Sequence, residues 1–349
     1  MIWLRRHVRP EQIRELSLLA LIIVAIVIFG SLIEGYYSFR TFNRIASSVA
    51  IITVVGVGQT LVVLTRNIDL SVGSICGFTA YFVGTLIADH NGINPLLAVA
   101  ISIALGAALG LVNGMIVAWG RVPAVVVTLG TLAIYRGVLV DLSGAKTVTT
   151  DSLPQWLVDL PRLNVVPIGD LDIRALFVIA LVIVVIFQFG TSYLSFARRF
   201  YAVGSNPEAA QLIGLPLKPI VFVAFVTSGA LAGLAGFMTL ARFGNITVEA
   251  GRGLELSVIA AVVVGGVNVF GGSGRVTGAM LGAIMIGILE QSLFRIGISE
   301  FWRDALLGLL ILLAVASDAV ILQRLNQLFA RTELKRLEAP ASAPGAPPS

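Results

Sequence analysis

Long apolar runs occupy most of this chain and leave little room for a soluble domain. Of its 349 residues, 57% are hydrophobic and only 12% are charged, about half the charged fraction of an average soluble domain. A helix needs about 20 apolar residues to cross a hydrocarbon core of about 30 Å. Ten runs reach or approach this length: 16–33, 45–65, 70–88, 91–120, 122–140, 175–197, 219–241, 256–274, 276–294 and 302–320. We therefore predict an all-α polytopic membrane protein with about ten transmembrane helices.

The distribution of Lys and Arg predicts which ends of these helices face the cytoplasm. Basic residues gather on cytoplasmic loops, and with ten spans the orientation with the more basic interior places both termini in the cytoplasm. Residues 1–15 then form a cytoplasmic N-terminal segment, 16–320 the transmembrane domain and 321–349 a cytoplasmic tail. The tail closes on a run of Pro, Ala and Ser that cannot bury a core, so we expect disorder at its end.

Two loops stand out in this topology. The longer one, 142–172, falls on the external side and contains Trp156 and four aspartates. It is either a contact surface for an external partner or a solvated loop with an interfacial anchor. The other, 198–218, is flanked by basic residues and falls in the cytoplasm. Its Asn206-Pro207 pair and Gly214 predict a short helix between them, which could dock into the groove of another protein.

Charged and polar residues interrupt the apolar pattern between runs two and three. Arg66 and Asp69 have little loop around them, and an ionised side chain deep in a helix costs about 2.5–3.5 kcal/mol on insertion scales. We therefore expect them at the membrane interface or paired with each other. Asn67 and Ser71 can cap the following helix. The cluster is either a charged cap on a tight turn or part of an inner gate.

A second group of gate or pathway candidates lies around run eight. Glu255 opens this run, and Gly265, Gly266 and Asn268 precede the glycine-rich segment 271–274. So much glycine within one span predicts a broken helix or a second cytoplasmic turn. Non-helical backbone at membrane depth persists only inside protein or beside a water-filled cavity.

Small residues at helical spacing predict close helix packing. Gly106, Gly110 and Gly114 recur every fourth residue, as do Gly278 and Gly282. Such spacing lets two helix backbones approach each other in lipid. The simplest reading is packing within the bundle, and a self-associating or partner face is the alternative. Segments 64–72 and 240–258 are also faintly alike, and the odd number of spans between them predicts an inverted repeat.

The chain lacks the sequence patterns of an enzyme. It contains no phosphate-binding G-x-x-x-x-G-K-[ST] loop, no zinc motif and no arranged catalytic triad. Its single cysteine, Cys76, lies in an apolar run and is interpreted as a packing residue. The basic residues are scattered at the ends of apolar runs, which argues against nucleic-acid binding. Energy for any transport must come from elsewhere, or transport is passive.

Three motifs carry a family resemblance: 61–74 (LVVLTRNIDLSVGS), 201–210 (YAVGSNPEAA), and AAVVVGG at 260–266 followed by GGSGR at 271–275. In this order, from about residue 45 to 318, they resemble the ribose/branched-chain family of permeases of ATP-binding-cassette (ABC) importers. The form TRNIDLS, followed by LGTL and YRG within 129–137, is similar to the rhamnose and autoinducer-2 branch of that family.

The resemblance implies a bacterial inner-membrane permease that acts in pairs, with a heterodimer favoured over a homodimer. Two ATPase subunits, which would hold ATP and magnesium, lie beneath it, and a soluble solute-binding protein lies outside; the chain itself needs no cofactor. By analogy, the residues that couple the permease to the ATPase are Asn206, Pro207, Glu208, Ala209, Ala210 and Gly214.

The solute is not determined by these residues, since selection in such systems mostly resides in the binding protein. A rhamnose-like monosaccharide is favoured, and autoinducer-2 is the alternative. An ion-driven or passive carrier and a non-transporting membrane scaffold are the other functions left open.

Overall fold

The computed structural model describes residues 10–313, apart from 91, 145, 169, 170 and 300. Within this part of the chain, eight helices are long and apolar enough to cross a membrane. They are α2 (Pro10–Leu32), α3 (Phe39–Leu64), α4 (Val72–Asp89), α5 (Pro95–Gly120), α6 (Ala124–Ser143), α8 (Ala175–Tyr193), α11 (Leu217–Phe243) and α13 (Val276–Arg295). The chain is thus an all-α polytopic membrane protein, as its apolar runs predict.

Two of the ten predicted spans are not among these eight helices. The run 256–274 does not form one continuous helix, because α12 (Leu254–Val264) ends at Gly265 and a glycine-rich turn follows. The broken-helix alternative is therefore correct, and the expectation of a full eighth span is wrong. The run 302–320 is helical over 301–313 and then passes beyond the described residues. The tail 321–349 and most of the segment 1–15 also lie beyond them.

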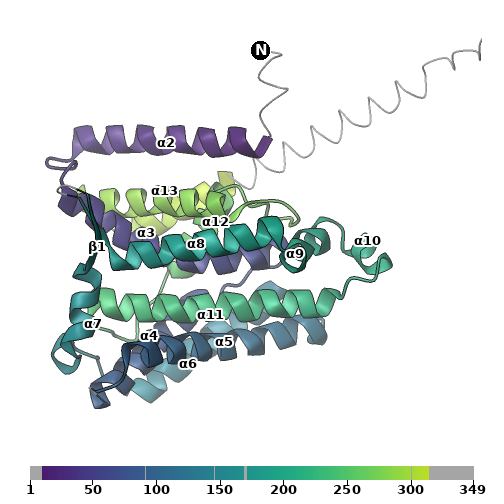
Figure 1. Ribbon diagram of the computed structural model, residues 1–349, viewed down its shortest axis with the longest axis horizontal. Coiled ribbons are helices and arrows are strands. Elements are labelled where there is room, and N and C mark those ends of the chain that lie inside the picture. The colour runs from purple at the N-terminus through teal and green to yellow at the C-terminus, as the bar shows by residue number, and fades with distance from the viewer. Residues whose placement is uncertain (1–9, 91, 145, 169–170, 300, 314–349) are drawn as a thin grey trace, which may run out of the picture.

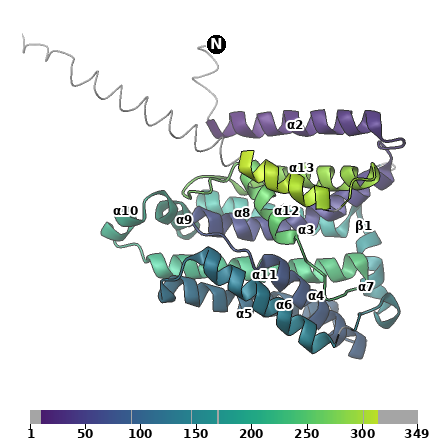
Figure 2. The ribbon, with the colours of Figure 1, turned by 180° about the vertical axis from the view of Figure 1, so that it is seen from behind.

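The long helices lie side by side along the longest axis of the molecule (Figure 1). Helix α3 is central, and every residue of its most apolar window is buried, whereas α2 lies along one edge of the bundle. The short helices α9 (Ser195–Ser205) and α10 (Pro207–Leu212) mark one end of the bundle in both views. The beginning of α2 points toward this end, while β1 and α7 lie at the opposite end (Figure 2). This arrangement agrees with the predicted topology.

The predicted external loop folds against its end of the bundle. It contains η1 (Thr150–Ser152), α7 (Gln155–Asp159), η2 (Leu160–Arg162) and a hairpin of β1 (Asn164–Ile168) with β2 (Leu171–Arg174). The strands are antiparallel, with Pro167 opposite Asp172. Leu157 is fully buried, and the Trp156 ring stacks on Phe237 of α11 with ring centroids 6.4 Å apart. A contact with an external partner stays a prediction for this segment.

The glycines at helical spacing pack helices together inside the chain. A Cβ atom built on Gly106 of α5 would lie only 2.6 Å from the Cα of Gly233 in α11, and one on Gly110 would lie 2.9 Å from the Cα of Gly229. In lipid, helices gain stability through such close van der Waals contact rather than through hydrophobic burial. The packing interpretation of these glycines is therefore supported, and no partner face is needed to explain them.

The two similar segments behind the predicted inverted repeat lie toward opposite ends of the bundle. The turn after α3 contacts the end of α9 through Arg66, whose side chain donates to the carbonyl oxygen of Gly204. The turn after α11 instead contacts the external segment, where Ile246 forms an isolated β-bridge with Val148. An inverted relation between the segments is compatible with this placement, and the repeat itself stays a prediction.

Candidate functional site

A short helix forms where Asn206-Pro207 and Gly214 predict it. The Asn206 side chain accepts a hydrogen bond from the backbone N–H of Ala209 at 3.0 Å, and Pro207 occupies the first turn of α10. Asn is a good N-cap because its side-chain oxygen satisfies an otherwise free helix N–H. Gly214 adopts the left-handed region at φ = 79°, which ends the helix. The local sequence thus defines both ends of α10.

The exposed surface of α10 is apolar at the C-terminal end of the helix. The exposed fractions of Leu212 and Ile213 are 89% and 75%, whereas Ala210 is buried against the bundle. Glu208 and Ala209 are exposed. Large apolar side chains that project from an end of the bundle, rather than from a lipid-facing helix wall, indicate a protein contact. Sequence reasoning missed Leu212 and Ile213, although two adjacent apolar residues in a polar loop were the available signal.

Arg66 connects this segment to the turn between α3 and α4. Its Nε donates to the carbonyl oxygen of Gly204 at 2.5 Å, and its Nη2 donates to that of Ser205 at 2.7 Å. Arg66 therefore does not pair with Asp69, and that alternative is wrong for this residue. Its backbone lies in the left-handed region at φ = 64°, which is uncommon for a residue other than glycine. The position of Arg66 at the end of the bundle agrees with the interface alternative.

Asp69 is fully buried inside the protein. Its Oδ1 accepts from the backbone N–H of Ser71 at 3.0 Å and from the Ser71 hydroxyl at 2.6 Å. Its Oδ2 accepts from the hydroxyl of Ser228 in α11 at 3.2 Å. The amide of Gln59 in α3 can also pair with the Asp69 backbone, with both distances at 3.2 Å. These donors offset the cost of burying the carboxylate.

The predicted caps of α4 are different in the structure. Asn67 does not cap the helix, because its amide donates back to the carbonyl oxygen of Thr65 at 2.8 Å. Ser71 occupies the cap position but makes no side-chain bond to the helix backbone. Its hydroxyl joins Asp69 to α5 instead, since the Asn113 amide donates to it at 2.7 Å. The Tyr135 hydroxyl of α6 donates to Asn113 at 3.3 Å. One polar network therefore joins this turn to three helices.

The glycine-rich turn after α12 contacts the same region. Asn268 stabilises the turn, because its side chain accepts from the N–H of Phe270 at 2.9 Å. The N–H of Gly272 donates to the carbonyl oxygen of Leu64 at the end of α3, at 3.1 Å. Gly265 lies so close to Gly278 of α13 that a side chain would collide with its backbone. The turn thus adjoins both the end of α3 and the start of α13.

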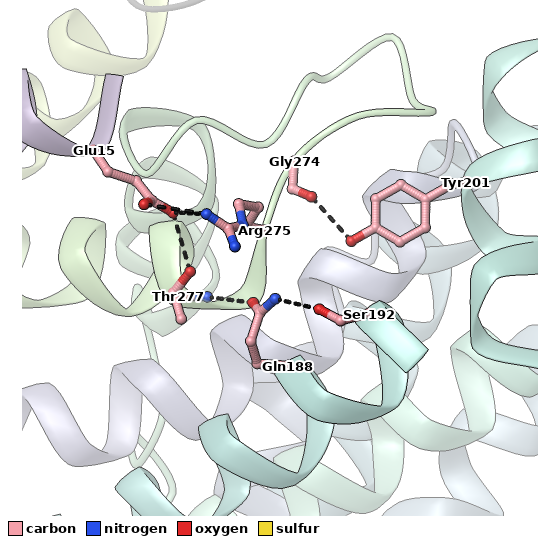
Figure 3. A network of polar contacts seen from close by, with 7 residues as sticks. All are labelled: Glu15, Gln188, Ser192, Tyr201, Gly274, Arg275 and Thr277. Carbon is pink, nitrogen blue, oxygen red and sulfur yellow. Dashed lines mark hydrogen bonds and ion pairs between the residues drawn. The ribbon is translucent and has the colours of Figure 1, made fainter. Parts of the chain in front are cut away.

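A further set of contacts ties α2, α8 and α9 to the start of α13 (Figure 3). Arg275 donates to Glu15 at 3.2 Å, and the Thr277 hydroxyl donates to the same carboxylate at 3.1 Å. The backbone N–H of Thr277 donates to Gln188 of α8 at 3.1 Å. The Tyr201 hydroxyl of α9 donates to the carbonyl oxygen of Gly274 at 3.0 Å (Figure 3). A displacement of α9 would therefore act directly on the glycine turn.

Glu255 lies in the first turn of α12, away from α10 and next to α4. A Cβ atom on Gly73, in the first turn of α4, would lie 3.3 Å from the carboxyl carbon of Glu255. Asp69 accepts a hydrogen bond from the backbone N–H of Ser71, the residue before the same turn of α4. The two predicted gate groups, around Asp69 and around Glu255, therefore meet at the start of α4.

Comparison with known proteins identifies the family. Residues 41–315 match the family described as "Branched-chain amino acid transport system / permease component". The chain belongs to this permease family. It is similar to the "Autoinducer 2 import system permease protein LsrC" of Escherichia coli (strain K12 / DH10B), with 35% identity over 94% of this chain and 93% of the relative. The LsrC protein of Salmonella typhi is 34% identical over 94% and 92%, respectively. No solved structure matches the chain.

Membership of this family gives the coarse function. The chain is the permease subunit of an ABC importer and a multi-pass protein of the inner membrane. Permeases of this family work with separate ATPase subunits and with a solute-binding protein. The structure brings together the two predicted gate groups and links them, through Arg66, to the segment before α10.

Proposed function

We propose that this permease imports autoinducer-2 or a closely related hydroxylated solute, with a rhamnose-like monosaccharide as the second candidate. The first solute is supported by relatives of 34% to 36% identity that carry the name autoinducer 2 import permease. The second is supported by the TRNIDLS and YRG motifs, which resemble both branches of the family. The second permease subunit of the importer is a different chain, so the pathway is formed by a heterodimer.

Helix α10 and the residues that follow it are the proposed docking site for the ATPase. The observation that carries this proposal is the pair of exposed apolar side chains, Leu212 and Ile213, at the end of the bundle where α9 connects to the interior. Short helices with apolar anchors bind in grooves of partner proteins, and such anchors contribute most of the binding energy when they become buried. ATP and magnesium are then held by the partner, and this chain needs no cofactor of its own.

In the proposed mechanism, movement of the ATPases displaces α10 and thereby α9. Arg66 transmits this displacement to the turn after α3, and Tyr201 transmits it to the glycine turn. The turn after α3 leads into α4, and the glycine turn follows α12. Helices α4 and α12 meet at their first turns, so a rigid shift at the end of the bundle reaches its interior. Packed helices respond to such shifts by switching between discrete arrangements, which here correspond to inward-open and outward-open states.

The docking proposal is tested with the double variant Leu212→Asp/Ile213→Asp. In cells producing the whole importer, we expect the variant permease to insert normally but to lose co-purification with the ATPase subunits. Leu163→Asp is the matched control, because Leu163 is an exposed apolar residue at the opposite end of the bundle, with an exposed fraction of 55%. Full retention of the ATPase by the double variant would rule out docking through α10.

The solute is tested by uptake into cells that lack other routes for it. Labelled autoinducer-2 and labelled rhamnose are supplied separately, and each is then competed with the unlabelled other. We expect uptake of autoinducer-2 to depend on this chain and to resist competition by rhamnose. The reverse pattern would favour the second candidate, and uptake in the absence of every partner ATPase would favour a passive or ion-driven carrier.

A further inference from the structure

The segment between α11 and α12, residues 244–253, does not stay at the outer end of the bundle. It descends along α4 toward the interior. A Cβ atom on Gly77 of α4 would lie 3.0 Å from the carbonyl carbon of Ala250, and one on Gly73 would lie 2.5 Å from the carbonyl oxygen of Gly251. Because both contacts are with the backbone of α4, the depth of the segment can be estimated from the positions of Gly77 and Gly73 along that helix.

The depth follows from the rise of an α-helix. Helix α4 ends on the outer side at Asp89, twelve residues after Gly77 and sixteen after Gly73. At 1.5 Å per residue, these positions lie about 18 Å and about 24 Å from the outer end of α4. An average helix tilt of about 20° shortens these depths by less than a tenth. The hydrocarbon core is about 30 Å thick, so Ala250 and Gly251 lie well inside it.

A second helix also holds this segment below the outer end of the bundle. Arg136 lies in α6, seven residues before that helix ends at Ser143, and therefore about 10 Å along the helix from its outer end. Its Nη1 donates to the carbonyl oxygens of Val248 and Ala250 at 2.5 and 2.7 Å. The side chain of a membrane-embedded residue thus holds the descending segment in place.

Two charged residues of this segment are exposed on the surface of the chain. The side chains of Glu249 and Arg252 are 59% and 76% exposed, and their carboxylate and guanidinium groups are 2.6 Å apart. A charge in contact with lipid at this depth costs about 2.5–3.5 kcal/mol or more. The backbone from Thr247 to Gly253 is also non-helical, and lipid cannot satisfy its polar groups. This surface therefore does not face lipid.

We propose that Glu249 and Arg252 line the water-filled path by which the solute crosses the membrane. The inference rests on the proposed transport function and adds the residues that contact the solute. Arg136 and Glu255 stand behind this pair, next to Gly77 and Gly73 of α4. The outer part of the path is thus formed by residues 247–255, and its inner part leads to the Asp69 network.

The charges on this surface fit a neutral solute with several hydroxyl groups. Two cations, Arg136 and Arg252, are balanced by two anions, Glu249 and Glu255, so the surface attracts neither anions nor cations strongly. Arg supplies only hydrogen-bond donors, whereas carboxylates and exposed carbonyl groups supply acceptors. A hydroxyl group both donates and accepts, so a polyhydroxylated molecule can replace its water contacts step by step along this wall.

Thiol labelling tests the path directly. Arg252→Cys is introduced into the whole importer and treated with a charged, membrane-impermeant methanethiosulfonate, from outside in intact cells and from inside in inverted vesicles. The native Cys76 is fully buried, so it gives little background. Val182→Cys in α8 is the control, with an exposed fraction of 49% on an apolar helix face. We expect Cys at 252 to react at least tenfold faster than Cys at 182 from at least one side.

Equal, slow reaction of both positions from both sides would overturn the proposal, because it would mean that the segment faces lipid or is covered by a second subunit. The neutral variants Glu249→Gln and Arg252→Gln then test the role in transport. We expect each to lower the rate of solute uptake at least tenfold while the complex still contains its ATPases. Unchanged uptake by both variants would also overturn it. Labelling does not depend on ATPase association, so a failure of assembly contradicts only the proposed function.

Discussion

Replacing Arg66 should uncouple ATP hydrolysis from transport. Its guanidinium makes two hydrogen bonds to the backbone just before α10, at 2.5 and 2.7 Å. A hydrogen bond to a charged group contributes about 1.5–3 kcal/mol, and the lower value applies here because Arg66 is exposed. Both bonds together then contribute about 3 kcal/mol. If half of this energy drives the switch, its loss lowers uptake about tenfold, since 1.4 kcal/mol is a factor of ten.

Arg66→Gly removes the side chain without straining the backbone, because glycine readily adopts the left-handed conformation of this position. Arg121→Gly is its matched control: Arg121 follows α5 with a similar φ of 56°, and its side chain makes no hydrogen bond or ion pair with the described residues. The purified importer in lipid vesicles is assayed for ATP hydrolysis and solute uptake together. We expect Arg66→Gly to keep hydrolysis and to lower uptake about tenfold, while Arg121→Gly keeps both. Equal uptake by the two variants would refute the coupling role of Arg66.

Two further pairs of substitutions test packing and the buried network. Gly106→Ala should destabilise the protein by about 1–3 kcal/mol, because its Cβ would lie 2.6 Å from Gly233; Gly130→Ala, with open space around it, should stabilise it by about 0.5–1 kcal/mol. Equilibrium unfolding in mixed detergent micelles measures both, and equal effects would contradict the packing. In the same assay, Asp69→Ala should lower the free energy of unfolding by about 2–4 kcal/mol, because it leaves the buried Ser71 N–H without its acceptor. Asp69→Asn keeps an acceptor oxygen and should cost less than half as much. Equal losses would show that the acceptor oxygen is not what matters.

The sequence predicts the helices well because a membrane restricts the choice of structure. Backbone groups in lipid must be satisfied internally, so a sufficiently long apolar run can only be a helix. The start of α5 at Pro95 and the ends of α10 follow from capping residues in the same way. The one false span, 256–274, failed because apolar composition does not distinguish a continuous helix from a helix interrupted at Gly265 and Gly266.

The site was harder to predict because its partners are distant in sequence. The buried carboxylate of Asp69 is stabilised by a hydrogen bond from Ser228, 159 residues later. Nothing near Asp69 in the sequence reveals this donor. Arg66 binds backbone carbonyl groups, which every residue has and which therefore leave no pattern. The descent of Glu249 and Arg252 into the bundle depends on contacts with α4 that only the folded chain brings about.

The residues after Pro207 are proposed to meet the ATPase on the cytoplasmic side, and the sidedness of Ile213 shows whether they do. Ile213→Cys is labelled with an impermeant maleimide in intact cells and, separately, in inverted membrane vesicles. The exposed position should react in the inverted vesicles and stay unmodified in intact cells, with protection when the ATPase subunits are present. Modification from the outside of intact cells alone would contradict the topology, the docking site and the coupling mechanism together.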